Sequence, residues 1–289
     1  MICPRPTFNV PLPNGRSLTL GPTTLVMGIL NITPDSFADG GRYLDPAAAE
    51  AAAIQMEGEG ADLLDVGGES TRPGSEEISA EEEIRRVQPV LRRLAGRLRI
   101  PISVDTTKPT VAEMALGEGA VMLNDVTGLR YDSGLASIAA RHRAALVLMH
   151  SRGRSRDMYQ EARYVSVSRE ISEELAGSLE RALAAGVPRE AIILDPGLGF
   201  AKRPEHSYAA LAGLPELAGL HRPMLVGPSR KSFLTAAIGE RPPSGRDVAT
   251  AAAVTAAVML GAHIVRVHAV APAADAVRVA DRLRDSITT

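Results

Sequence analysis

Cysteine and aromatic residues are scarce in this sequence. The one cysteine, Cys3, has no partner within the chain, which excludes an internal disulfide and fits a reducing compartment such as the cytoplasm. Aromatic residues make up 3% of the chain and tryptophan is absent, so no stacking surface for single-stranded nucleic acid is expected.

A strong net charge and long apolar runs are missing as well. The formal net charge is −2, from 32 basic and 34 acidic side chains, so the whole molecule is not drawn to nucleic acid or to anionic membranes. No apolar stretch approaches the ~20 residues that cross a bilayer, and the start MICPRPTFNV lacks a signal-peptide hydrophobic segment. We therefore expect a cytoplasmic enzyme that acts on small molecules.

Eight apolar runs of strand length alternate with Ala-, Leu- and Glu-rich stretches of helical composition. The runs are nearly continuous in apolar character, as in parallel strands that are covered on both faces. They span residues 23–30, 61–67, 100–106, 121–126, 145–150, 191–197, 224–229 and 264–268. Without a break in composition, this repeat predicts one closed (β/α)8 barrel domain over residues 1–289. An open, doubly wound sheet is the alternative.

Three local patterns add detail to the predicted barrel. Ser79 and Glu82 form a capping-box pattern that opens a helix over about residues 80–96. Pro13-Asn14-Gly15 between short apolar runs predicts a hairpin within residues 1–22, outside the repeat and placed to close the bottom of the barrel. The Ala-rich stretch 247–260 suits either close internal packing or a contact with a second copy of the chain.

Polar residues stand where the strands end, and in a barrel these ends form the catalytic face. Asp195 either caps the turn made by Pro196 and Gly197 or accepts two parallel N–H bonds from a planar heterocycle. Asn124 offers complementary donor and acceptor atoms to the same ring, whereas Asp125 is expected to cap its own loop.

Residues at other strand ends indicate a binding site for an anion. Lys231 stands where a glycine-containing turn runs into a predicted helix N-terminus, although a surface basic run is the alternative. Arg266 and His268 alternate on the last strand and face the same way, as in a phosphate clamp. The amide of Asn31 suits hydrated Mg²⁺ or a phosphate oxygen, and no HxxH or CxxC spacing indicates a transition metal.

Two long loops follow the first two strands. The first contains Asp35 and Gly40-Gly41, and the second places Thr71 and Arg72 between glycines, with Glu69 as a possible brace. Such a composition suits a mobile lid over the site, or a loop that is merely exposed.

Taken together, these segments resemble the dihydropteroate synthases. The matching motifs are MGILNITPDSFADGG (27–41), DVGGESTRPG (65–74), SVDTTKP (103–109), NDVTG (124–128), LDPGLGFAK (194–202), GPSRKSF (227–233) and RVH (266–268). Each motif is weak alone, but their ordered combination is highly specific. One segment departs from the family pattern: MHSRGRSRDMYQEARYVSV, after the fifth strand, lacks a proline that the family usually has there.

The resemblance implies a homodimeric, sulfonamide-targeted transferase that joins 6-hydroxymethyl-7,8-dihydropterin pyrophosphate to p-aminobenzoate. The implied pterin pocket consists of Asp105, Asn124, Met149, Asp195, Gly227 and Lys231. The implied pyrophosphate site consists of Asn31, Arg266 and His268, with Asn31 also contacting Mg²⁺. The implied p-aminobenzoate site consists of Phe37, Thr71, Arg72, Pro73, Phe200 and Ser232. Asp105, Lys231, Asn31 and Asp35 are implied to be catalytic, and His150 is expected to be structural.

The family mechanism is dissociative, and it needs no Ser–His or Cys–His pair because the arylamine is itself a nucleophile. Positioning and electrostatic stabilisation would then carry most of the acceleration. Two other functions are compatible with a pterin-binding barrel: a methyltransferase acting between methyltetrahydrofolate and a corrinoid protein, and a non-catalytic pterin-binding paralogue.

Overall fold

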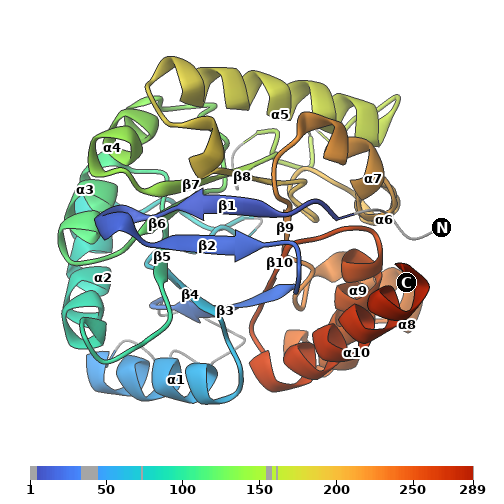
Figure 1. Cartoon of the computed structure of the whole chain (residues 1–289), viewed down its shortest axis with the longest axis horizontal. Coiled ribbons are helices and arrows are strands. Elements are labelled where there is room, and N and C mark those ends of the chain that lie inside the picture. The colour runs from blue at the N-terminus through green and yellow to red at the C-terminus, as the bar shows by residue number, and fades with distance from the viewer. Residues whose placement is uncertain (1–4, 34–44, 73, 154–157, 161, 289) are drawn as a thin grey trace.

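The fold is a ring of parallel strands surrounded by helices (Figure 1). The computed structural model describes residues 5–33, 45–72, 74–153, 158–160 and 162–288. The barrel strands are β3 (Leu25–Asn31), β4 (Leu63–Gly67), β5 (Ile102–Asp105), β6 (Met122–Asp125), β7 (Ala145–Met149), β8 (Ile192–Asp195), β9 (Leu225–Val226) and β10 (Ile264–Val267). Their order around the sheet is β8-β7-β6-β5-β4-β3-β10-β9.

A bridge between Leu194 and Met224 joins the two ends of this sheet. The predicted closed barrel is confirmed, and the open doubly wound alternative is wrong because β8 and β9 also meet. Strand β9 is much shorter than the predicted run 224–229. Pro228 has no N–H to donate to a ladder, and Gly227 begins the turn that leads away from the sheet.

Helices connect the strands and cover the outside of the ring (Figure 1). They are α1 (Pro46–Gly58), α2 (Ala80–Leu94), α3 (Pro109–Gly117), α4 (Gly134–His142), α5 (Val167–Ala184), α6 (Pro204–Ala212), α7 (Leu214–Leu217), α8 (Thr235–Ile238), α9 (Asp247–Met259) and α10 (Val270–Thr288). Short 3-10 turns are η1 (Pro13–Gly15), η3 (Arg189–Ala191), η4 (Ala218–Leu220), η5 (Ser232–Leu234) and η6 (Pro243–Arg246). No helix within the described part of the chain is both long and apolar enough to cross a membrane.

Two of the predicted helices form, and their contacts show which predicted details are correct. Ser79 caps α2 by accepting the N–H of Glu82 at 3.2 Å, but the Glu82 side chain pairs with Arg86 at 2.7 Å instead of returning to the cap. Half of the predicted capping box therefore forms. On α9, Ala253, Val254, Ala257 and Val258 are buried in the core, so this Ala-rich face serves internal packing.

The N-terminal hairpin closes the bottom of the barrel, as predicted. Strands β1 (Phe8–Pro11) and β2 (Ser17–Leu20) pair antiparallel across η1 and lie across the ring in Figure 1. Val10, Leu12 and Leu20 pack in one apolar cluster with barrel residues such as Met27 and Met122. Because this cluster fills the amino-terminal end of the barrel, a site inside it has to open at the carboxyl ends of the strands.

Candidate active site

A cavity of about 520 Å³ lies at the carboxyl ends of the strands. Most of the predicted site residues line it: Asn31, Thr71, Arg72, Asp105, Phe200, Lys231, Ser232, Arg266 and His268. They come from six separate loops or strand ends, so only the closed barrel brings them together. Among the predicted residues, Asp35, Phe37 and Pro73 lie outside the described residues.

The other predicted pterin residues lie off the cavity wall. Asn124 and Asp195 are only 3% and 5% exposed, and Met149 and Gly227 are also buried. Strand register places Asn124 beside Asp105 and Met149 beside Asp195. These side chains therefore belong to the same face of the barrel, behind the residues that line the cavity.

Arg266 links two buried carboxylates under the cavity. Its Nε donates to Asp65 at 2.6 Å and one Nη donates to Asp105 at 2.8 Å. Asn124 donates to the same oxygen of Asp65 at 2.9 Å. Asp65 was not among the predicted site residues, although a charged residue inside the apolar run LLDVG was a signal for one. This pairing fixes the orientation of the Arg266 head and leaves its second Nη without a hydrogen bond to a described residue.

The ionisation of Asp105 is strongly perturbed. Burial raises the pKa of Asp105 to about 7, the Arg266 charge opposes this shift, and the nearby Asp65 charge adds to it. A carboxyl group with a pKa near neutrality titrates in the range where enzymes operate, which is common for a group that takes part in chemistry.

One carboxylate oxygen of Asp195 caps the turn, and the other is available to accept a hydrogen bond from a ligand. Its Oδ1 accepts the Gly197 N–H at 2.7 Å, so the turn-capping interpretation is right. Within the described residues, Oδ2 has no hydrogen-bond partner. Burial raises the pKa of Asp195, while the Lys231 charge lowers it. The two interpretations of Asp195 are therefore compatible, one for each oxygen.

The charge of Lys231 acts on the Asp195 carboxylate. Its Nζ donates to the Leu198 carbonyl and lies 4.7 Å from the centre of the Phe200 ring. Burial lowers the pKa of Lys231 to about 8. The helix expected to begin here is only η5 followed by the four-residue α8, so its N-terminus contributes little to anion binding.

Ser229 holds His268 in place. The Ser229 hydroxyl accepts the His268 backbone N–H at 3.0 Å and lies 2.9 Å from the ring Nδ1. A hydroxyl can donate to Nδ1 or accept a proton from it, so this contact fits either tautomer of the ring. Burial lowers the pKa of His268, so the ring is neutral and brings no full charge to the cavity.

The loop after β4 is braced from below, as suggested for Glu69. One oxygen of Glu69 accepts the Ile78 N–H at 2.8 Å, and the other pairs with Lys108 at 2.6 Å. Lys108 also pairs with the buried Glu83 at 2.6 Å. These contacts fix the base of the loop that carries Thr71 and Arg72.

The segment after β7, which departs from the family pattern, contributes two lining residues that the sequence analysis missed. Met158 and Tyr159 both contact the cavity. Their apolar and aromatic character was the available signal, but nothing in the linear sequence placed this loop over the site.

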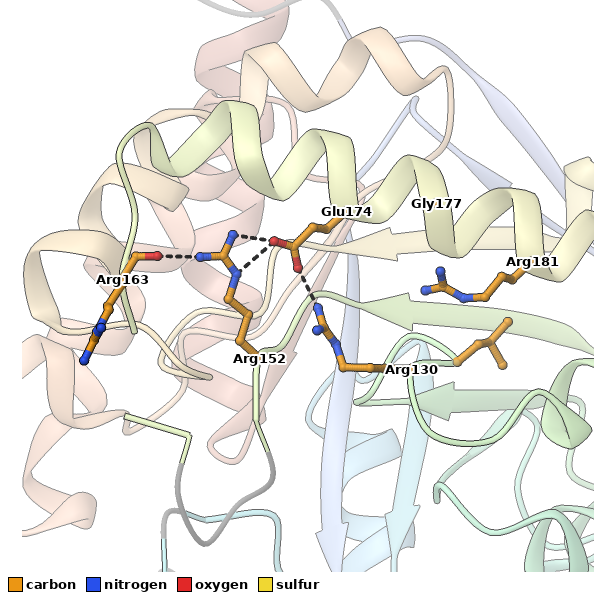
Figure 2. A pocket seen from close by; sticks show the side chains of 7 residues that line it. Arg130, Arg152, Arg163, Glu174, Gly177 and Arg181 are labelled. Atoms are coloured by element: carbon orange, nitrogen blue, oxygen red, sulfur yellow. Dashed lines mark hydrogen bonds and ion pairs between the residues drawn. The ribbon is translucent and has the colours of Figure 1, made fainter. Parts of the chain in front are cut away.

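A second cavity, of about 540 Å³, lies beside α5 and has a different character. Four arginines and one glutamate surround it: Arg130, Arg152, Arg163, Arg181 and Glu174. Figure 2 shows Arg130 and Arg152 pointing at Glu174 from two sides. None of the predicted site residues lines this cavity, so the strand-end cavity is the candidate active site. Among the described residues, no group of three His, Cys, Asp or Glu side chains forms a metal site.

Comparison with known proteins identifies the family of the chain. The family described as "Pterin binding enzyme" matches residues 27–268. The chain is 44% identical over 278 residues to a dihydropteroate synthase of Synechocystis, with 96% of each chain covered. A Yersinia pestis dihydropteroate synthase, solved with a sulfonamide drug, superposes with a TM-score of 0.92 at 38% identity, covering 96% of this chain and 100% of that one. A Burkholderia cenocepacia dihydropteroate synthase complexed with 7,8-dihydropteroate gives a TM-score of 0.87 at 37% identity, covering 100% and 99%. The chain therefore belongs to the pterin-binding enzyme family, as a dihydropteroate synthase.

Proposed function

We propose that this chain condenses 6-hydroxymethyl-7,8-dihydropterin pyrophosphate with p-aminobenzoate, releasing pyrophosphate and 7,8-dihydropteroate. The observation that carries the proposal is the buried pair of Asn124 and Asp195 on the face of the barrel that holds a cavity lined with anion-binding groups. Asp195 Oδ2 offers two lone pairs to the parallel N–H groups of a pterin, and Asn124 offers an amide to the same edge. The Burkholderia relative, named for its dihydropteroate complex, supports a synthase over a methyltransferase or a non-catalytic paralogue.

We assign the pyrophosphate to Asn31, Arg266 and His268. All three line the cavity. The second Nη of Arg266 has no hydrogen bond to a described residue, and we assign the ring proton of His268 to Nε2, so both present donors to phosphate oxygens. The partial burial of these groups strengthens each such contact relative to water.

Mg²⁺ is proposed to arrive with the pyrophosphate. This ion keeps several waters and takes one or two protein oxygens together with substrate phosphates. The amide oxygen of Asn31 at the cavity wall fits that requirement. When bound, Mg²⁺ would neutralise charge that develops on the leaving group.

The second substrate is assigned to the remaining predicted residues of the cavity. Thr71, Arg72, Phe200 and Ser232 line the cavity, and Arg72 offers a cation to the carboxylate of p-aminobenzoate. The Phe200 ring provides a flat apolar contact for the aryl ring.

The proposed reaction breaks the bond between the pterin methylene carbon and the pyrophosphate oxygen before the new bond is complete. The arylamine nitrogen then bonds to this carbon and releases a proton. The positive charge that develops on the pterin lies close to Asp105, whose carboxylate form stabilises it. Exclusion of water by the loops after β3 and β4 would protect this cation.

Product formation tests the assignment directly. We expect purified protein with Mg²⁺, the pterin pyrophosphate and p-aminobenzoate to form dihydropteroate and pyrophosphate in equal amounts, detected by liquid chromatography and a phosphate assay. A reaction without p-aminobenzoate is the control. No dihydropteroate above that control would refute the proposed function.

The pH dependence of the reaction tests the role of Asp105. Because its pKa is raised to about 7, Asp105 is protonated below that pH and ionised above it. We expect kcat/KM for the pterin substrate to rise between about pH 6 and 8, as the carboxylate forms. Asp105→Asn should be much slower and should lose this rise. A wild-type profile that is flat across this range contradicts the role.

We also propose a homodimer, with the cytoplasm as its location. Val279, Leu283 and Ile287 are exposed at four-residue spacing on α10, which gives one helix face an apolar stripe, and Val248 is exposed on the adjacent α9. Sedimentation at the monomer mass at micromolar concentration would contradict the dimer. The cytoplasmic location rests on the single cysteine and is tested by fractionation.

A further inference from the structure

Lys202 is a buried amine, and it has no acidic partner among the described residues. It lies between β8 and α6, is only 1% exposed, and forms no salt bridge with a described residue. Burial lowers its pKa well below the usual value. A buried amine costs stability unless its hydrogen bonds are satisfied, so its contacts have to be strong and specific.

The choice of lysine at this position is itself informative. The chain has only three lysines, Lys108, Lys202 and Lys231, among its 32 basic side chains. Lys231 lines the active-site cavity and Lys108 braces its loop. A planar guanidinium with five donors does not fit a small enclosed site that has three acceptors, whereas the smaller head group of lysine does.

Three acceptors surround the Lys202 Nζ. They are the His150 ring Nδ1 at 2.8 Å, the Phe200 carbonyl at 3.1 Å and the His150 carbonyl at 3.4 Å. Two of them belong to the end of β7 and the third to the loop after β8. Lys202 therefore ties together two segments that are distant in sequence.

A contact with Glu174 determines which ring nitrogen of His150 carries the proton. Its Nε2 lies 3.4 Å from a carboxylate oxygen of Glu174 on α5, close enough for an electrostatic contact but without the alignment of a hydrogen bond. A carboxylate at that position favours a proton on Nε2, which leaves the Nδ1 lone pair to accept from Lys202. Burial lowers the pKa of His150 to about 4, so the ring is neutral near pH 7 and this tautomer is maintained.

Glu174 is held in turn from the outside. Arg152 donates to it from Nε at 2.8 Å and Arg130 from Nη2 at 2.5 Å, as the dashed lines in Figure 2 show. Burial of Glu174 would raise its pKa, but the adjacent His150 ring and the hydrogen bonds from Arg152 outweigh burial and keep it well below its usual range. A continuous chain of contacts thus runs from the surface arginines to Lys202.

The loop anchored by Lys202 carries part of the active site. Asp195 begins it and Phe200 lies within it. Gly197, Gly199 and Ala201 all have positive φ, at 66°, 81° and 49°, so the loop follows an irregular path that regular backbone hydrogen bonds do not hold. A Cβ on Gly197 would stand 2.0 Å from the His150 carbonyl, which shows how closely the loop packs on the end of β7.

We propose that Lys202 is a positioning residue of the active site, which acts through His150 and Glu174 to hold the loop bearing Asp195 and Phe200 in place. Its effect on catalysis rests on the proposed function, because it works through the roles assigned to Asp195 and Phe200. Its effect on the position of the loop does not depend on the proposed function.

Lys202→Met tests the proposal, since methionine has a similar length but no donor. We expect amide hydrogen exchange of residues 197–203 to accelerate in the ligand-free protein by about 10- to 100-fold, the equivalent of one or two lost hydrogen bonds. We expect kcat/KM for p-aminobenzoate to fall by a similar factor, mainly through KM. Arg169→Met, which removes an exposed ion pair on α5, is the control for both measurements.

Two variants of His150 test whether its Nδ1 is the atom through which Lys202 acts. Asparagine places an acceptor near the position of Nδ1, whereas glutamine reaches the position of Nε2. His150→Asn is therefore expected to lose much less than His150→Gln, which should resemble Lys202→Met. Equal losses for the two variants would overturn the role of the Nδ1 contact.

Two results would overturn the proposal for Lys202. One is unchanged exchange of residues 197–203 together with unchanged kinetics in Lys202→Met. The other is faster exchange throughout the barrel with equal losses for both substrates, which indicates a purely structural role. If the loop exchanges faster but wild-type protein makes no dihydropteroate, the positioning role stands and the proposed function fails.

Discussion

Asp195→Ala is expected to abolish measurable binding of the pterin substrate. The variant removes a buried carboxylate whose Oδ2 is assigned to two pterin N–H groups, and those donors would then be buried without an acceptor. Losses of this kind amount to about 3 kcal/mol or more, which corresponds to at least ~100-fold in affinity. Isothermal titration with the pterin substrate measures the effect, and an unchanged affinity would remove Asp195 from the pterin site.

The alanine variant also removes the turn cap, because Oδ1 accepts the Gly197 N–H. Asp195→Asn separates the two roles. Asparagine keeps an oxygen for Gly197 but presents an NH₂ group toward the pterin donors. We expect this variant to unfold close to the wild-type midpoint and still bind the pterin at least ~100-fold more weakly. Normal binding by Asp195→Asn would mean that only the cap matters.

Arg266→Ala is expected to have the largest effect on stability, and to abolish activity. Asp65 and Asp105 would be left buried without their shared cation, and removal of one partner from such a network costs about 3–5 kcal/mol. Urea unfolding monitored by circular dichroism measures this loss. Arg278→Ala, which removes an exposed ion pair with Asp275, is the matched control and should change stability by less than about 0.5 kcal/mol.

The loss of stability in Arg266→Ala should depend on pH. The folded-state pKa of Asp105 is already raised to about 7 by burial, and the removal of the opposing Arg266 charge raises it further. A folded pKa above the unfolded one means that the folded state binds more protons, so stability falls as pH rises through this range. We therefore expect the variant to be less impaired at pH 5 than at pH 8, and an equal deficit at both would contradict the assignment.

Arg266→Ala also tests the pyrophosphate site. If its free Nη binds phosphate oxygens, affinity for the pterin pyrophosphate should fall much more than affinity for the pterin alcohol, which lacks the phosphates. Titrations at pH 5–6, where more of the variant is folded, allow the comparison. Equal losses for the two ligands would assign Arg266 to the pterin pocket alone.

The strand pattern predicted the barrel and the end of it that carries polar residues, whereas the family resemblance implied most of the individual roles. Parallel strands buried on both faces appear as continuous apolar runs, and the residue after each run has to emerge at the same end of the barrel. For this reason the sequence alone places Asn31, Asp105, Lys231, Arg266 and His268 together. The sequence pattern did not predict where strands and helices end. Strand β9 is two residues long because Pro228 lacks an N–H for the sheet, and the α-helix after Lys231 is only one turn.

The partners of these residues emerged only from the folded chain. Asp65 and Arg266 are separated by 201 positions, and Lys202 and His150 by 52, so no periodicity connects them. A hydrogen bond depends on distances of a fraction of an ångström, which are set when strands close into a ring and side chains pack. A linear pattern records which face a residue occupies, whereas the tertiary structure decides which atom it contacts and therefore which proton it holds.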